Sequence, residues 1–149
     1  MEIGVEAAFA QAKKSLSEGG IPVGACLMID NTVIAVGHNR RVQKGSNILH
    51  GETDCIEAAG HAFDLRQATL FTTLSPCKMC AGAILLYGIP KVIILDNINT
   101  GDFETSEAML RDAGVDVVIH IDDRIVEMKR AFQTNPETRR LWVGDVGLD

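Results

Sequence analysis

The sequence is organised around two short runs, His50-Gly51-Glu52 and Ser75-Pro76-Cys77-Lys78-Met79-Cys80. They supply one imidazole and two thiols, which are ligands that suit zinc. Structural zinc sites are usually closed by four protein ligands, whereas catalytic sites have three and keep the fourth position for water. No further Cys or His follows at ligand spacing, so the sequence predicts a catalytic zinc site on His50, Cys77 and Cys80.

Glu52 lies two residues after His50 and is not needed as a ligand. We therefore expect it to be the catalytic acid and base beside the water on the metal. A lone C-x-x-C would be weak evidence, because it could be a redox pair or half of a zinc ribbon. The remaining alternative is a zinc module without catalysis, which predicts no need for Glu52 and no free coordination position.

Composition limits the function classes. The 149 residues predict one domain, residues 1–149, and the 46% hydrophobic content allows a sizeable core. The net charge of -6 argues against a nucleic-acid partner, because such proteins usually carry a basic patch. We find neither a secretory signal pattern nor an apolar run near the roughly 20 residues that span a bilayer, so we expect no membrane partner. Four cysteines, two of them assigned to metal, favour a reducing cytoplasm.

Hydrophobic periodicity and turn signals predict an α/β protein. A nearly continuous apolar run at 91–95 indicates a strand that is buried on both faces, and we expect the same of 115–121. The order of elements predicts a three-layer α/β/α sandwich on a mixed five-stranded sheet. The expected strands are 23–29, 32–36, 69–73, 91–95 and 115–121; the expected helices are 3–18, 50–62, one from Ser75 to Gly88, 104–113, 123–132 and a short last helix within 137–149.

The second run fits the start of a helix. Ser75 can cap that helix, and Pro76 suits its first turn. Cys77 and Cys80 are three residues apart, so one helical turn would present both sulfurs to one ion. A helix start also favours the thiolate form that binds metal.

Four further residues have side chains that could serve the site. Cys26 lies inside an apolar strand, and we expect it and Cys55 to pack in the core. His38 could be a ligand or a base, but with nothing else at zinc spacing we favour a structural or surface role. Asn39 is the better candidate for contacting substrate, because an amide both donates and accepts hydrogen bonds.

The order H-x-E followed by P-C-x-x-C is a known signature of zinc-dependent base deaminases. The sequence resembles the cytidine-deaminase-like superfamily and, within it, the small cytosine deaminases of fungi. The resemblance covers about 5–99 and returns in the tail, where 142–147 matches that group's closing W-x-x-D-[IV]-G. The stretches that carry it are 18–24, 37–39, 43–46, 49–52 and 72–90.

For the metal, the resemblance implies one zinc ion per chain on His50, Cys77 and Cys80, with Glu52 as proton shuttle. The residue types already indicate these three ligands. The resemblance also implies a tight homodimer.

For the substrate, the resemblance implies that Asn39 and the backbone of Gly51 hold one edge of the ring. Asp145 would accept from the exocyclic amine, and Trp142 would close the pocket as a lid. We also count Ser75 among the expected substrate-binding residues.

One departure concerns the ring face. A Phe that stacks on the pyrimidine in that group corresponds here to Thr100, and Phe103 could replace it if the loop shifts. The expected activity is hydrolytic deamination of a free nucleobase, first cytosine to uracil and ammonia. Isocytosine, guanine or a creatinine-like ring is the alternative substrate, and a nucleoside or tRNA is the less favoured one.

Overall fold

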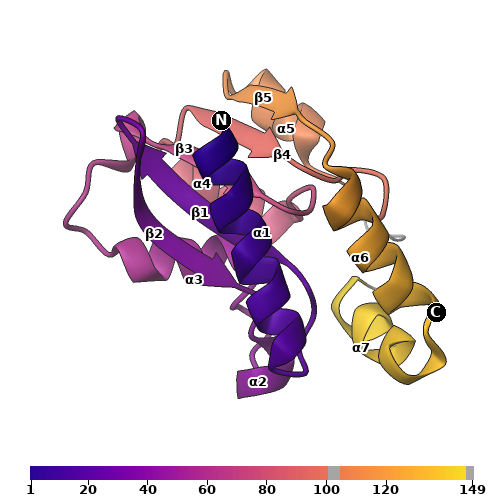
Figure 1. The fold of residues 1–149 in the computed structure, drawn as a ribbon. Coiled ribbons are helices and arrows are strands. Elements are labelled where there is room, and N and C mark those ends of the chain that lie inside the picture. The colour runs from indigo at the N-terminus through magenta and orange to yellow at the C-terminus, as the bar shows by residue number, and fades with distance from the viewer. Residues whose placement is uncertain (101–104, 147–149) are drawn as a thin grey trace.

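The computed structural model describes residues 1–100 and 105–146, and within them five strands form one mixed sheet (Figure 1). The strand order is β2-β1-β3-β4-β5. β1 runs antiparallel to both of its neighbours, β2 and β3, whereas β4 and β5 run parallel to β3. The bounds are β1 Gly24–Ile29, β2 Thr32–His38, β3 Thr69–Thr72, β4 Lys91–Ile94 and β5 Asp116–Ile119.

Helices cover both faces of this sheet, which confirms the expected three-layer sandwich. In Figure 1, α1 (Glu2–Ser17) and α6 (Asp123–Thr134) lie in front of the sheet, and α3 (Gly51–Ala59), α4 (Lys78–Leu86) and α5 (Glu107–Asp112) lie behind it. The last helix, α7 (Pro136–Val146), packs beside α6. Within the described ranges, no helix has the length and apolar content that a membrane span requires.

Side chains that alternate along the strands pack into two hydrophobic cores, one on each face of the sheet. Leu70 and Val92 pack on the α3–α5 side, whereas Phe71 and Ile93 pack on the α1 and α6 side. Cys55 belongs to the first core and Cys26 to the second, and both are fully buried, as expected for core cysteines. A third cluster lies at the end of the sheet and joins α7 to it; its buried members are Ile21, Val23, Leu74, Phe132 and Trp142.

One expectation about the elements is wrong, and two short helices were missed. The strand at 115–121 is shorter and not buried: β5 forms an edge of the sheet, and its end residues Asp116 and Ile119 are exposed. Its apolar run indicated burial, but an edge strand has a neighbour on one side alone, which local sequence does not reveal. The short helices α2 (Arg41–Lys44) and η1 (Leu65–Gln67) were not predicted at all.

A buried ion pair fastens α6 to the end of β4. The ammonium of Lys129 lies 3.5 Å from Asp96 Oδ2, and both side chains are fully buried. Asp96 Oδ1 also accepts the backbone N–H groups of Ile98 and Asn99, so the same carboxylate closes the turn after β4. Burial lowers the pKa of Lys129 to about 8, because a desolvated ammonium is less stable than a neutral amine.

We predict that Lys129→Met will lower the free energy of unfolding by about 3–5 kcal/mol at pH 7, because it leaves the buried Asp96 carboxylate without its cation. Urea denaturation measures the loss. The double variant Lys129→Met/Asp96→Asn removes both charges and should regain part of it. A single variant within about 0.5 kcal/mol of the parent would contradict a structural role for the pair.

Candidate active site

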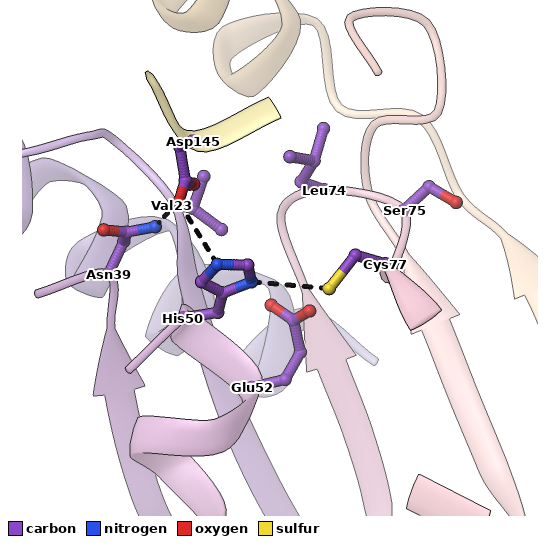
Figure 2. Close-up of a pocket in the computed structure, with 8 residues that line it drawn as sticks. All are labelled: Val23, Asn39, His50, Glu52, Leu74, Ser75, Cys77 and Asp145. Carbon is purple, nitrogen blue, oxygen red and sulfur yellow. Dashed lines mark hydrogen bonds and ion pairs between the residues drawn. The ribbon is translucent and has the colours of Figure 1, made fainter. Parts of the chain in front are cut away.

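A small cavity lies at one end of the sheet, where β2 and β3 end and α3 and α4 begin (Figure 2). It encloses about 70 Å³ and has both polar and aliphatic walls. Its lining brings together residues from the start, middle and end of the chain. They are Val23, Asn39, His50, Glu52, Leu74, Ser75, Cys77 and Asp145.

Three potential metal ligands converge on this cavity. His50 Nδ1 lies 3.5 Å from Cys77 Sγ and 3.6 Å from Cys80 Sγ. The three donor atoms all lie within 4.8 Å of one another, so one ion can contact all of them. Two thiols and one imidazole nitrogen are a donor set that suits zinc. Among the described residues, this is the group of three such side chains that could hold a metal ion.

The ligands stand at two helix starts, His50 one position and Cys77 two positions closer to the start of its helix than expected. His50 is the N-cap of α3, where its backbone N–H donates to Thr53 Oγ1 at 2.9 Å. Cys77 is the extended N-cap of α4 (φ -76°, ψ 175°), and Cys80 lies in the first turn. The thiol of Cys80 and the ring of His50 lower the pKa of Cys77 to about 4, despite the opposing effect of burial. Cys77 is therefore disposed to be the thiolate that metal binding requires.

Ser75 does not cap α4, because the helix begins at Lys78 and Cys77 takes the cap position. The Ser75 hydroxyl instead donates to Glu107 Oε2 at 2.7 Å, and Figure 2 shows it pointing away from the His50 ring. Ser75 still lines the cavity. Its substrate contact stays a prediction, and Glu107 is a partner that sequence reasoning missed because α5 is distant in the chain.

Glu52 points into the cavity beside the ligands (Figure 2). Its side chain is nearly inaccessible, at 3% exposure for the residue, and Oε1 accepts from the hydroxyl of Thr72 at 3.0 Å. Burial raises the pKa of this carboxyl, because desolvation disfavours its charged form. A carboxyl group with a raised pKa is better able to hold a proton and then return it. Thr72 was not singled out in the sequence, since its position offers no local signal.

Asn39 and Asp145 form the opposite wall. Asn39 Nδ2 donates to Asp145 Oδ2 at 3.0 Å, and Asn39 Oδ1 accepts from the backbone N–H of Arg41 at 2.9 Å. The other Asp145 oxygen, Oδ1, lies 3.2 Å from His50 Nε2. Asn39 follows β2 and Asp145 comes from α7, so this wall is assembled from residues 106 positions apart.

The loop that carries Asn39 is held from behind by α1. His38 is fully buried, and its Nε2 lies 2.8 Å from Glu18 Oε1. The Ser15 hydroxyl donates to the backbone carbonyl of Asn39 at 2.9 Å. His38 is thus placed to support the loop, and it is not among the residues that line the cavity.

Two other expected residues, Trp142 and Gly51, do not line the cavity. Trp142 is fully buried behind Val23 and Leu74, where it anchors α7. Gly51 is buried in the first turn of α3. Thr100 is half-buried, and Phe103 lies outside the described residues. Direct contacts of Trp142 and Gly51 with substrate therefore stay predictions.

Comparison with known proteins relates this sequence to zinc-binding deaminases. Residues 2–96 match the family described as the cytidine and deoxycytidylate deaminase zinc-binding region. A cytosine deaminase of Candida albicans is 44% identical over 148 residues, which cover 97% of this chain and 95% of that protein. A tRNA-specific adenosine deaminase of Bacillus subtilis is 40% identical over 95 residues, covering 62% of this chain and 59% of the relative.

The solved structures agree on the fold. A guanine deaminase from Nitrosomonas europaea superposes with a TM-score of 0.76 at 18% identity, covering 89% of this chain and 84% of that one. The two sulfurs, the imidazole nitrogen and the adjacent buried Glu52 are the groups that a zinc-binding deaminase region requires. The chain therefore belongs to the cytidine and deoxycytidylate deaminase family of zinc-dependent hydrolases.

Proposed function

We propose that the protein catalyses the hydrolytic deamination of a free nucleobase. Cytosine is the preferred substrate, and uracil and ammonia are the products. The observation that carries this proposal is the buried Glu52, which lies beside three convergent zinc ligands and shares its cavity with Asn39 and Asp145. Full-length similarity to a cytosine deaminase supports the choice of base. A place in pyrimidine salvage would follow from that reaction.

The donor set fits zinc, and His50, Cys77 and Cys80 would hold it. Bound there, zinc would lower the pKa of water to about 7 and so make hydroxide available at neutral pH. Glu52 would take the proton released from water and pass it to the ring nitrogen next to the attacked carbon. It would then take the proton of the hydroxyl group newly added to the ring carbon and give it to the amine, which leaves as ammonia while the carbonyl forms. One buried carboxyl group thus serves each proton transfer.

Asn39 and Asp145 would orient the ring. After its bonds to Asp145 and Arg41, the Asn39 amide keeps one N–H and one lone pair for substrate. These match a neighbouring C=O and N–H on the ring edge. The Asp145 carboxylate can only accept when ionised, so it suits the exocyclic amine.

Of the two alternative substrate classes, one has support and the other is favoured less. The fold shared with a guanine deaminase keeps another free amino-heterocycle open, including isocytosine or a creatinine-like ring. A tRNA or nucleoside substrate is favoured less, because the tRNA-specific relative matches only 62% of this chain and the net charge is -6. We propose no nucleic-acid or membrane partner.

We also propose a homodimer in the cytoplasm. The end of α4 exposes Leu86 at 75% and Tyr87 at 50%, beside a groove between α3 and α4 that Ile56 and Leu65 help to line. Exposed apolar patches of this kind mark association sites. The four cysteines are all free thiols, which suits a reducing compartment.

We predict that Glu52→Gln will keep the fold and bind zinc but lose at least about 10²–10⁴-fold in kcat, because an amide cannot shuttle protons. Ammonia release and elemental analysis measure the two properties. Cys77→Ala is the matched control, which should lose zinc and activity together. Turnover of Glu52→Gln within a few-fold of the parent would show that another group moves the proton.

On a panel of free bases and nucleosides, we predict the highest kcat/KM for cytosine and little activity on cytidine. A site that hydrogen-bonds specific groups can reject analogues by factors of up to roughly 10⁴–10⁵. Steady-state ammonia release gives the ranking. Faster release from cytidine than from every free base would replace the free-base proposal by the nucleoside alternative.

We predict that Leu86→Glu will shift the protein from dimer to monomer in sedimentation velocity, because a charge would be buried without a partner at the interface. Ile3→Glu is the matched control, since Ile3 is 58% exposed on α1, on the other side of the sheet. A parent that sediments as a monomer, or a Leu86→Glu variant that stays dimeric, would contradict this interface.

A further inference from the structure

The two ring nitrogens of His50 face different partners. Nδ1 lies 3.5 and 3.6 Å from the sulfurs of Cys77 and Cys80, so it is the nitrogen that a shared metal ion would contact. Nε2 points the other way and lies 3.2 Å from Asp145 Oδ1 (Figure 2). His50 thus lies directly between the metal-binding sulfurs and the carboxylate of the last helix.

A histidine that binds metal through one nitrogen has its proton on the other. Donating this N–H to a carboxylate fixes the tautomer and the ring orientation and makes the ligating nitrogen more basic. We propose that Asp145 is such a positioning residue for His50, so that docking of α7 tightens the hold of the site on its zinc. This role is separate from the acceptance of a substrate amine.

Asp145 is well placed for this role. Its side chain is 7% exposed, so water competes little for the carboxylate. Asn39 Nδ2 binds the second oxygen at 3.0 Å and thereby fixes the direction of the first. An ionised carboxylate has about four acceptor positions, so two remain for a substrate amine. The two roles are therefore compatible in one residue.

The tail reaches the metal site through apolar packing. Trp142 lies three residues before Asp145 in α7 and is fully buried against Val23, Leu74 and Phe132. This packing holds the helix that carries the carboxylate. Because coupling between two equilibria is reciprocal, zinc should also stabilise the docked α7.

The test compares Asp145→Ala and Asp145→Asn with the parent in equilibrium competition for zinc against a chromogenic chelator. We expect Asp145→Ala to bind zinc about 10–100-fold more weakly, the usual cost of removing such a partner. Asp145→Asn should fall between it and the parent, because an amide oxygen can still accept the Nε2 proton but lacks the charge. Ser75→Ala is the control: Ser75 lines the same cavity, but its hydroxyl is bound to Glu107, so its zinc affinity should match the parent.

The rates of zinc association and dissociation distinguish this role from one in which α7 only blocks access to the site. If α7 only blocks access, Asp145→Ala will speed zinc association and dissociation equally and leave the Kd within twofold of the parent, which would overturn the proposal. If Asp145 positions His50, dissociation will accelerate more than association.

Hydrogen exchange supplies the reciprocal test. Zinc should slow exchange of the α7 amides in the parent and much less in Asp145→Asn, and equal protection in both would also overturn the proposal. Thermal unfolding in excess zinc checks that the variants are folded. None of these measurements uses a substrate, so their outcome does not depend on whether cytosine is the base.

Discussion

The site depends on the pairing of β1 with two strands at once. Both β2 and β3 run antiparallel to β1, and their last residues lie opposite its first: His38 pairs with Gly24, and Thr72 pairs with Ala25. The chain therefore leaves both strands at the same end of the sheet. The segments that follow carry His50 and Cys77, which is why ligands separated by 27 residues meet there.

Gly24 lies at the centre of this pairing. Its N–H donates to Thr73 Oγ1 at 3.0 Å, and its carbonyl accepts the Thr73 N–H at 2.9 Å. A Cβ at this position would lie 2.4 Å from backbone atoms of Ala8 and Ala12, so only glycine lets α1 approach the strand so closely. The same close approach brings Ser15 within reach of the Asn39 carbonyl. The end of β3 and the loop that carries Asn39 are thus both positioned by the close approach of α1 to β1.

The sequence predicted what depends on local spacing. His50 and Glu52, and Cys77 and Cys80, are close in the chain, so their shared position follows from the start of a helix. The link from His50 to Asp145 and the pair of Lys129 with Asp96 could not be predicted, because each joins segments that only the folded chain brings together. The edge position of β5 has the same cause: burial of a strand is decided by its neighbours, not by its own apolar residues.

Trp142 shows how one residue type supports two interpretations. The resemblance implies that Trp142 is a lid, and the structure buries its ring against Val23 and Leu74, where it anchors α7. The two interpretations are linked energetically. Burying a large aromatic side chain offsets the entropy lost when α7 is ordered. The residue that anchors the helix therefore also determines how often Asp145 is in place.

The two carboxyl groups of the cavity differ in their surroundings, and that difference supports the different roles proposed for them. Glu52 is almost fully buried, and burial raises its pKa, so it can exchange a proton during a reaction. Asp145 lies between the Asn39 amide and His50 Nε2, two groups that can donate to it. A carboxylate held by donors suits a fixed acceptor rather than a shuttle. Asp145 comes from α7 and Glu52 from α3, so the two carboxyl groups are held in the cavity by different elements of the fold.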